Sequence, residues 1–474
     1  MARLTGLDDV RAVLAAEDPH GRLMPCGLQR LIVGPGVLDE LPAAVAACAS
    51  GAAVIALIVD ETPIMRQGQD VKALAEDLLR RDAVVRRVVL SDGHSELHVT
   101  DAVVQQAIDG ADGADVIVAL GGGTISDIGK LVAHARPGLP VVTVMTAASV
   151  DGYTDDVSVT LKDGVKRTVP SVWPDVVLAD AETVAEAPAR MNRAGYGEMT
   201  SMYIAPADWK LAAIVGIDPS FHPGPVVLLG MLAEELDACA TGVAAGEPGA
   251  VQQLTWALAL RGIATGVAGT TACLSGVEHL VSHMLDLRAA ELGLPTGLHG
   301  EQVGVGSVVA ACAWEMLVDR LAADPARRVQ SAALEAARSE QRVRAAFDSL
   351  DPTGRISDEC WRDYGRKVER LRELQPQLDG VLATWPEHAS ALAELARPSD
   401  VIAQGLRSAG APVTFADLDV SPEVARWAVE NCALMRNRFT VIDLLNALGW
   451  WESADVDEVF ARVARAVSPS GVPA

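Results

Sequence analysis

Hydrophobic positions between residues 30 and 190 follow two alternating patterns. The first is a short apolar run of strand length, seen at Leu31–Val33, Ala52–Val59, Val84–Leu90, Asp115–Leu120 and Val141–Val144. The second is a segment with helical spacing between these runs, seen at Val37–Ala49, Val71–Arg80, His98–Asp109 and Thr124–Ala135. This alternation predicts a mostly parallel, doubly wound sheet with helices packed against it.

The pattern changes further along the chain. Residues 157–170 alternate apolar and polar positions around Asp163-Gly164, which predicts a β-hairpin. Strand signals then disappear, and long segments rich in Ala, Leu, Glu and Arg predict helices alone. We therefore expect an α/β fold with two domains. Residues 1–187 form a Rossmann-like parallel-sheet domain, and residues 188–474 form an all-helical domain.

The composition limits the kinds of molecule that the chain is expected to bind. Half of the 474 residues are hydrophobic, which is enough for a large core. The 63 acidic residues outnumber the 39 basic ones and give a formal net charge of −24. So acidic a chain is not expected to bind nucleic acid or membrane surfaces in general. A phosphorylated substrate would need a local basic patch.

The N-terminus and the cysteines indicate the cytoplasm. The segment MARLTGLDDVRAVLAAEDPHG contains acids and lacks the apolar centre of a signal peptide. No apolar run reaches the roughly 18 residues that a membrane span needs. The seven cysteines are scattered and form no CxxC, so we expect reduced thiols in a cytoplasmic protein.

A glycine-rich loop is the candidate nucleotide site. Gly121-Gly122-Gly123 connects a predicted strand to a helix in the sequence GGGTISD. The uncovered backbone N–H groups and the positive end of the helix can bind a pyrophosphate. A plain strand–turn–helix joint is the alternative. Asp60 ends an earlier strand and can accept a hydrogen bond from a ribose 2′-OH, which favours NAD over NADP. It can equally be a helix cap or a loop acid.

Three of the nine histidines, His279, His283 and His299, fall close together in the sequence. His279 and His283 are spaced i, i+4 and share one face of a predicted helix. Two imidazoles and a distant carboxylate form a divalent-metal site with open positions for water or a substrate oxygen. Glu198, in the segment GYGEM, is the candidate carboxylate. The alternatives are buried core histidines and a glutamate at a helix N-terminus.

Seven segments, taken in order, resemble one enzyme family. They are GGGTISDIGK (121–130), TAASVDGYT (146–154), GVKRTVP (164–170), AGYGEMTSMYIAPADWKLA (194–212), SGVEHLVSHML (275–285), LHGEQVGVG (298–306) and RNRFTVIDLLNALG (436–449). They resemble the sn-glycerol-1-phosphate dehydrogenases, particularly the bacterial branch. These enzymes belong with the iron-containing alcohol dehydrogenases, glycerol dehydrogenases and dehydroquinate synthases. The resemblance covers residues 25–315 and 400–450, and residues 321–400 carry no matched motif.

The resemblance implies a Rossmann-like domain and a helical domain with the active site in the cleft between them. Members of the family reduce dihydroxyacetone phosphate to sn-glycerol 1-phosphate with NADH or NADPH. They use zinc, or nickel in some bacterial members, and iron is a further candidate for this chain. The resemblance also implies a homo-oligomer, a dimer or larger.

Roles for individual residues follow by position. The nucleotide-binding residues implied by the resemblance are Gly122, Gly123, Asp127, Thr146 and Ser149, and Gly121 and Thr124 belong to the same glycine loop. The implied metal ligands are His279 and His299, with Glu198 at the position of the third ligand. The implied substrate contacts are Asp151 and His283, and Glu198 also faces the substrate.

Two positions depart from the family pattern. Glu198 stands where the family usually has Asp in a GxGD motif, and it offers the same oxygen donor on a side chain one methylene longer. The dehydroquinate synthases also use Glu there. Asp155 stands where the family usually has a serine that touches the cofactor. A carboxylate near a pyrophosphate is unfavourable unless it turns away.

These residues lead to a hypothesis of carbonyl reduction. The metal at Glu198, His279 and His299 would polarise the ketone, and the nicotinamide would supply hydride. Asp151, His283 or a bound water would relay the proton. The candidate phosphate anchors are Lys166, Arg167, Arg436 and Arg438, which can also be ordinary surface cations.

Three other functions remain open at this point. The chain could act on another polyol, polyol phosphate or specialised-metabolite ketone. It could be a sugar-phosphate cyclase that uses NAD transiently, which Glu198 favours and the segments TAASVDGYT and GVKRT disfavour. It could also be a catalytically silent nucleotide-binding protein, although the presence of both His279 and His299 argues against that.

Overall fold

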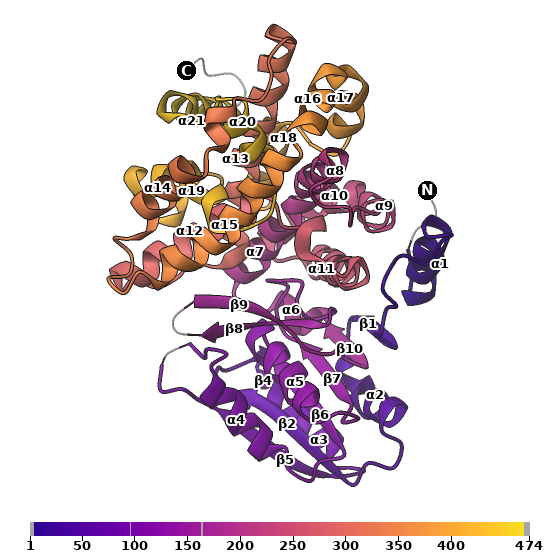
Figure 1. The fold of residues 1–474 in the computed structure, drawn as a ribbon. Coiled ribbons are helices and arrows are strands. Elements are labelled where there is room, and N and C mark those ends of the chain that lie inside the picture. Colours follow the sequence, from indigo (N-terminus) through magenta and orange to yellow (C-terminus); the bar gives the residue numbers. More distant parts are fainter. Residues whose placement is uncertain (1–3, 95, 163–164, 469–474) are drawn as a thin grey trace. The chain divides into compact units, whose positions relative to one another are not determined.

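A six-stranded parallel sheet forms the core of the N-terminal part of the computed structural model, which describes residues 4–94, 96–162 and 165–468 (Figure 1). The strand order is β1-β10-β7-β6-β2-β5, and all five pairings are parallel. The strands are β1 Arg30–Gly34, β2 Val54–Asp60, β5 Val84–Leu90, β6 Val116–Gly121, β7 Val141–Met145 and β10 Val176–Asp180. The predicted parallel sheet is confirmed.

Helices cover both faces of this sheet. They are η1 Val37–Glu40, α2 Leu41–Cys48, α3 Val71–Leu79, α4 Asp101–Gly110 and α5 Gly123–Ala135. In β2, Ile55 and Leu57 pack into a cluster with η1, α2 and α3, whereas Ala56 and Ile58 pack into a second cluster with α4 and α5. Because β2 is buried on both faces, its sequence is a continuous apolar run rather than an alternating one.

Two antiparallel hairpins accompany the sheet. β3 Met65–Arg66 pairs with β4 Gln69–Asp70, and β8 Val157–Lys162 pairs with β9 Val165–Pro170. The second hairpin confirms the one predicted at residues 157–170. Its predicted turn, Asp163-Gly164, lies outside the described residues.

After the sheet, every element in the described chain is helical, as the sequence predicted. The α-helices are α6 Ala181–Ala185, α7 Ala189–Met199, α8 Ala205–Val215, α9 Pro223–Gly230, α10 Ala233–Ala245, α11 Pro248–Ala268, α12 Val277–Leu292, α13 His299–Ala323, α14 Ala336–Phe347, α15 Arg355–Glu373, α16 Gln375–Ala383, α17 Trp385–Ala393, α18 Ser399–Ser408, α19 Pro422–Asn431, α20 Val441–Ala447 and α21 Ser453–Ala466. Within the described ranges, none of the helices has the length and apolar character needed to cross a membrane.

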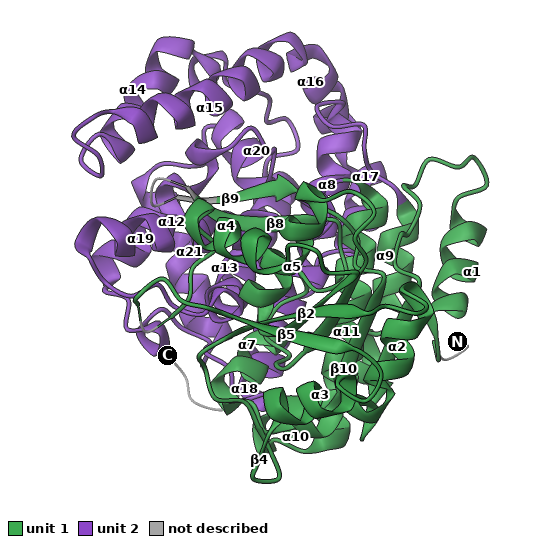
Figure 2. Ribbon diagram, turned by 90° about the horizontal axis from the view of Figure 1, so that it is seen from below, with its two compact units in different colours: residues 1–196, 223–269 green, residues 197–222, 270–474 purple. Residues whose placement is uncertain are grey.

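The chain divides into two compact units, neither of which is continuous in sequence (Figure 2). Unit 1 contains residues 1–196 and 223–269, so that α9, α10 and α11 belong with the sheet. Unit 2 contains residues 197–222 and 270–474.

Several local elements differ from the sequence prediction. The single helix expected at Val37–Ala49 is a 3₁₀ turn, η1, followed by α2, because Pro42 lies in the first turn of α2, where its missing N–H costs nothing. Strand β10 and the N-terminal helix α1, Leu7–Glu17, were not predicted. β10 lies between β1 and β7 and completes the sheet.

Candidate functional site

The glycine loop of unit 1 lies where the strand order of the sheet reverses. β5 lies on one side of β2, whereas β6, β7 and β10 continue on the other side. Ile58 of β2 pairs with Ala119 of β6 in parallel, so the two strands end side by side. Asp60 is the last residue of β2 and Gly121 the last of β6. Ligands of doubly wound sheets bind at the carboxyl ends of the strands at this reversal.

The backbone of this loop fits a phosphate. Gly122 caps α5, which begins at Gly123, and the first N–H groups of a helix have no partner within the helix. A Cβ at Gly122 would meet nothing within 4 Å, so the backbone there is open. A Cβ at Gly123 would lie 2.8 Å from Val150 Cγ2. Thr124 follows in the first turn, and Thr146 N donates to Gly121 O at 3.2 Å.

Asp60 is held by a buried lysine. Lys72 Nζ lies 2.7 Å from Asp60 Oδ1 and also donates to the backbone carbonyls of Asp60 and Thr62 at 2.6 Å each. The side chain of Asp60 is about a fifth exposed. The carboxylate therefore has a fixed position at the end of β2, with part of its surface open.

A second buried lysine holds two predicted cofactor residues. Lys130 Nζ lies 2.7 Å from Asp155 Oδ1 and 3.3 Å from Asp127 Oδ1, and it donates to Gly152 O at 2.7 Å. Lys130 is fully buried, and Asp127 Oδ2 accepts from Val159 N. The carboxylate of Asp155 is thus compensated by a cation within the protein. This pairing offsets part of the unfavourable charge expected from that departure, because Lys130 is shared between Asp155 and Asp127. Ser149, a further predicted residue, is buried in the same unit.

Asp151 is fixed by helix α11. Its Oδ2 forms an ion pair with Arg261, which is 2 % exposed. The same turn is held by Thr154 Oγ1, which donates to Ala259 O at 2.7 Å. Gly262 allows this close approach, because a Cβ there would lie 2.2 Å from Thr154 Oγ1 and 2.5 Å from Asp151 O. The carboxylate of Asp151 remains 18 % exposed.

The three predicted metal ligands come together in unit 2. Glu198 lies in the last turn of α7, His279 in the first turn of α12, and His299 is the first residue of α13. One ligand atom from each residue lies within 4.8 Å of the other two. Glu198 Oε1 is 3.3 Å from His279 Nε2, and Glu198 Oε2 is 3.9 Å from His299 Nε2. One carboxylate and two imidazoles form a donor set that fits a divalent cation.

Glycine allows the backbone of the ligand helices to come this close. A Cβ at Gly197 would lie 2.2 Å from Gly300 O, which brings the end of α7 against the start of α13. A Cβ at Gly306 would lie 2.7 Å from Glu278 O, which brings α13 against α12. Glu198 and His279 are buried, and the side chain of His299 is 26 % exposed. Of these three side chains, His299 is therefore the one that is partly accessible.

His283 lies beside the cluster. Its ring centroid is 6.5 Å from that of His279 and 5.9 Å from that of His299. The rings of His283 and His299 are stacked at 23°. His283 is outside the ligand group but close enough to contact a molecule bound there.

Glu278, which was not predicted from the sequence, forms a hydrogen bond with the ring nitrogen of His279 that is not near Glu198. Glu278 Oε1 lies 2.9 Å from His279 Nδ1 and accepts from Gly276 N at 2.6 Å, and its side chain is fully buried. A carboxylate on Nδ1 leaves Nε2 for a cation. Burial lowers the pKa of His279, but the hydrogen bonds to Glu198 and Glu278 outweigh it and raise the pKa above its usual value.

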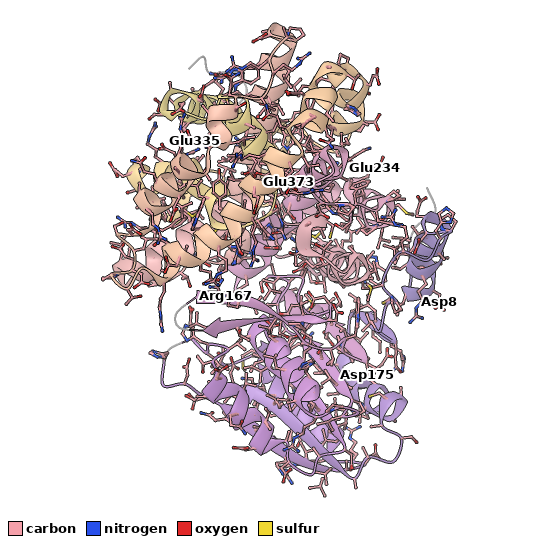
Figure 3. All side chains as sticks on the ribbon, in the orientation of Figure 1. Asp8, Arg167, Asp175, Glu234, Glu335 and Glu373 are labelled. Carbon is pink, nitrogen blue, oxygen red and sulfur yellow. The ribbon has the colours of Figure 1, made fainter. Side chains whose placement is uncertain are left out.

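The basic residues predicted to bind the substrate phosphate lie in different parts of the structure. Arg167 lies on β9 of unit 1, where Figure 3 labels it. In unit 2, Arg438 donates to Ser275 O and, at 2.7 Å, to Thr271 Oγ1, so it supports the loop before α12. Arg436 is partly buried in the same segment. The side chain of Lys166 lies outside the described residues.

Residues 32–188 match the family of iron-containing alcohol dehydrogenases. A glycerol-1-phosphate dehydrogenase [NAD(P)+] of Bacillus licheniformis is 27 % identical over 434 residues, covering 90 % of each chain. The enzyme of the same name from Natronomonas pharaonis is 33 % identical over 282 residues, covering 59 % of this chain and 75 % of the relative.

Solved structures with the same fold are more distant in sequence. A probable glycerol dehydrogenase from Sinorhizobium meliloti superimposes with a TM-score of 0.56 at 19 % identity, covering 93 % of this chain and 98 % of the other. Maleylacetate reductase from Agrobacterium tumefaciens gives a TM-score of 0.56 at 16 % identity, with 94 % and 99 % covered. These structures share the two-part architecture of a parallel sheet and a helical portion.

Proposed function

Since the chain belongs to the glycerol-1-phosphate dehydrogenase family of iron-containing alcohol dehydrogenases, we propose that it reduces dihydroxyacetone phosphate to sn-glycerol 1-phosphate with NADH or NADPH and catalyses the reverse oxidation. The chain is an NAD(P)-linked alcohol dehydrogenase. The proposal adds the substrate, the metal dependence and the roles of individual residues.

One observation carries the proposal: Glu198, His279 and His299 converge from three helices on one point. At metal sites a ligating histidine usually donates its other ring N–H to a carboxylate or another oxygen, and Glu278 occupies that position beside His279. The partial exposure of His299 is compatible with open coordination positions at this group. A catalytic metal site requires such open positions, because a substrate oxygen has to enter one.

Bound at these residues, a divalent cation would polarise the ketone, and a bound nicotinamide would supply the hydride. Zinc fits one carboxylate and two imidazoles, and nickel or iron would fit the same donors. Glu198 holds the cation with its carboxylate, and His279 and His299 hold it with Nε2. Glu198 also lines the substrate position.

Other residues of the chain are proposed to transfer the proton and to bind the substrate phosphate. Asp151, fixed through Oδ2 by Arg261, offers Oδ1 for a substrate hydroxyl or a proton. His283, beside the cluster, is the other candidate to give the proton to the forming alcohol. Lys166 and Arg167 are the proposed phosphate anchors of the hairpin.

The glycine loop supports binding of the cofactor. In this proposal Gly121, Gly122, Gly123 and Thr124 hold the pyrophosphate with their backbone, and Thr146, Ser149, Asp127 and Asp155 line the remainder of the site. Asp60 takes the ribose hydroxyl of NAD. Because Lys72 pairs with Asp60 and reduces its negative charge, NADP remains a candidate.

The test is turnover by metal-stripped protein. NADH oxidation is followed with dihydroxyacetone phosphate, with and without added Zn²⁺ or Ni²⁺. We expect activity only with metal and a full loss in His279→Ala. His388→Ala, which changes a partly exposed histidine on α17, serves as the matched control and is expected to keep activity.

Two outcomes would reject parts of the proposal. Absence of turnover with either metal rejects the substrate, and a panel of polyol, polyol-phosphate and other ketones then identifies the correct one. Turnover of a sugar phosphate without net NADH consumption would indicate a cyclase.

The remaining expectations concern the cell and the assembly. The seven cysteines all lie in the part of the chain that the structure describes, and there none of them forms a disulfide, which suits the reducing cytoplasm that we propose. We also propose a homo-oligomer, a dimer or larger, which light scattering of the purified protein would measure directly.

A further inference from the structure

A chain of hydrogen bonds leads away from His299 into the protein. His299 Nδ1 lies 2.9 Å from Ser282 Oγ, and Ser282 Oγ donates to Gln302 Oε1 at 2.7 Å. Gln302 Nε2 then donates to Asp286 Oδ1 at 3.2 Å. Ser282 and Asp286 lie one turn apart on α12, and His299 and Gln302 lie one turn apart on α13. This series of hydrogen bonds therefore links two helices of unit 2.

The direction of each hydrogen bond follows from the last member. A carboxylate oxygen of Asp286 accepts, so Gln302 presents its NH₂ group to it and its carbonyl oxygen to Ser282. The single hydroxyl proton of Ser282 is donated to that carbonyl. Towards His299, Ser282 has only lone pairs, so Nδ1 of His299 carries the proton and donates it. The other ring nitrogen, Nε2, then carries the lone pair, and it lies 3.9 Å from Glu198 Oε2.

We infer that Ser282, Gln302 and Asp286 are positioning residues that fix His299 in the tautomer able to bind metal through Nε2. The inference rests on the metal site proposed above. Water cannot easily substitute for these residues, because Ser282 is fully buried and Gln302 is 3 % exposed. The two ligand histidines thus have different supports: a direct carboxylate, Glu278, for His279 and a relayed carboxylate, Asp286, for His299.

A purely structural role of these hydrogen bonds predicts a different result. If the four residues only joined α12 to α13, removing Ser282 would lower stability and leave the tautomer and the metal affinity unchanged. If they orient His299, removing the Ser282 hydroxyl would weaken metal binding more than the same change at a buried serine away from the site. Partners of this kind typically contribute 10-fold to 100-fold in metal affinity.

The first measurement is zinc affinity by chelator competition, at a temperature well below unfolding. Ser282→Ala is expected to weaken zinc binding by about 10-fold to 100-fold. Ser357→Ala is the matched control, because Ser357 is also a fully buried serine of unit 2 that donates to a carboxylate, Asp348 Oδ1, at 2.6 Å. The control is expected to keep the wild-type affinity. Equal affinities of Ser282→Ala and wild type would overturn the inference.

The second measurement needs no metal. Long-range ¹H–¹⁵N NMR of histidine-labelled apoprotein at alkaline pH reports which ring nitrogen carries the proton, and His299→Gln identifies the signal. We expect Nδ1–H in the wild type and a mixture of tautomers in Ser282→Ala. Nε2–H in the wild type would overturn the inference. If the wild type bound no zinc but showed Nδ1–H, the proposed metal site would fail while the positioning of the ring stood.

Asp286→Asn provides an independent variant. An asparagine can donate as well as accept, so Gln302 can turn over, present its NH₂ group to Ser282 and reverse the whole chain. We expect a mixed tautomer at His299 and zinc affinity between those of wild type and Ser282→Ala. A wild-type tautomer and affinity in this variant would contradict the assigned direction of the chain.

Discussion

At the scale of single residues, Glu278 fixes the ring of His279, a proposed metal ligand. Its buried carboxylate bonds Nδ1 at 2.9 Å, which directs Nε2 towards Glu198. Glu278→Gln keeps an acceptor of the same shape but removes the charge. We expect zinc affinity to fall by about 10-fold, measured by chelator competition.

The control for this variant is Glu315→Gln. Glu315 lies on α13 of the same unit and accepts hydrogen bonds from Ser399, away from the three ligands. It is expected to bind zinc as the wild type does. A Glu278→Gln protein with unchanged affinity would show that the carboxylate plays no part in the metal site.

Asp208 makes stability depend on pH. Its carboxylate accepts from Val277 N, Val441 N and Trp314 Nε1, yet burial, with a contribution from the charge of Glu278, raises its pKa from 3.8 to about 8. The folded protein therefore binds this proton more tightly than the unfolded chain. The stabilisation is fully present below the unfolded value and is lost as pH rises from about 4 to about 8.

The expected slope for this one group is up to ~1.4 kcal/mol of unfolding free energy per pH unit. Urea unfolding at several pH values measures it, with Asp208→Asn as the comparison. The asparagine protein is less stable, but its stability should vary less with pH by that amount. Parallel curves for the two proteins would show that Asp208 does not titrate in this range.

The sequence indicated the proposed metal ligands more clearly than the residues that contact them. His279 and His299 were conspicuous because histidine is scarce in this chain, and Glu198 lay in a glycine-rich segment. Lys130 and Asp155 are 25 positions apart and meet only through the fold. Such pairs have no periodicity, so no pattern in the sequence indicates them. Glu278 was adjacent to His279 and could have been considered as its partner.

At the scale of elements, helix α11 fixes the turn of residues 151–154, where Asp151 is the proposed substrate contact. Gly262→Ala would place a Cβ 2.2 Å from Thr154 Oγ1 and 2.5 Å from the carbonyl of Asp151. Overpacking of this kind typically costs about 1–3 kcal/mol. We expect lower stability and a lower kcat/KM for dihydroxyacetone phosphate, with unchanged zinc affinity because the ligands are in unit 2. Thermal unfolding, steady-state kinetics and zinc titration measure these effects.

Gly249→Ala is the control on the same helix. A Cβ at Gly249 would meet nothing within 4 Å, so this change is expected to be neutral or to stabilise the helix by up to about 1 kcal/mol. If both variants behaved alike, the close approach of α11 to the turn would not matter for activity.

Most elements of the sheet could be predicted because burial on both faces produces unbroken apolar runs. β2 and β6 were found within two residues of their observed bounds. β10 has the same kind of run, Val176–Asp180, but follows a hairpin without an intervening helix. The β/α alternation that identified the other strands was therefore absent, and only the pairing with β1 and β7 reveals it.

At the scale of the whole molecule, residues 321–400 are part of unit 2 rather than a separate addition. Lys367 on α15 is fully buried, with its Nζ 2.7 Å from Asp443 Oδ1 and 2.8 Å from the carbonyls of Ala433 and Arg438. This lysine ties α15 to the segment that the sequence matched as RNRFTVIDLLNALG. At least one of the charged side chains in residues 321–400 is therefore buried.

Lys367→Met is therefore expected to destabilise the protein by about 3–5 kcal/mol, because the carboxylate of Asp443 would remain buried without its cation. Lys210→Met, which removes a less buried lysine of α8, should change stability far less. Denaturant unfolding compares the two. Equal stability of both variants would mean that the buried pair contributes nothing to unit 2.

The division of the chain can be tested with fragments. The boundary predicted at 187/188 remains a prediction, and a fragment of residues 1–187 lacks α11, which supplies Arg261 and the carbonyl of Ala259 to the 151–154 turn and packs against β1. We expect this fragment to unfold without a cooperative transition and to bind NADH poorly, as measured by circular dichroism and fluorescence titration. Residues 1–269 restore α9, α10 and α11 and should recover binding. If residues 1–187 unfolded cooperatively and bound NADH as the full chain does, the sheet domain would be complete without those helices, and the boundary seen in the sequence would be the correct one.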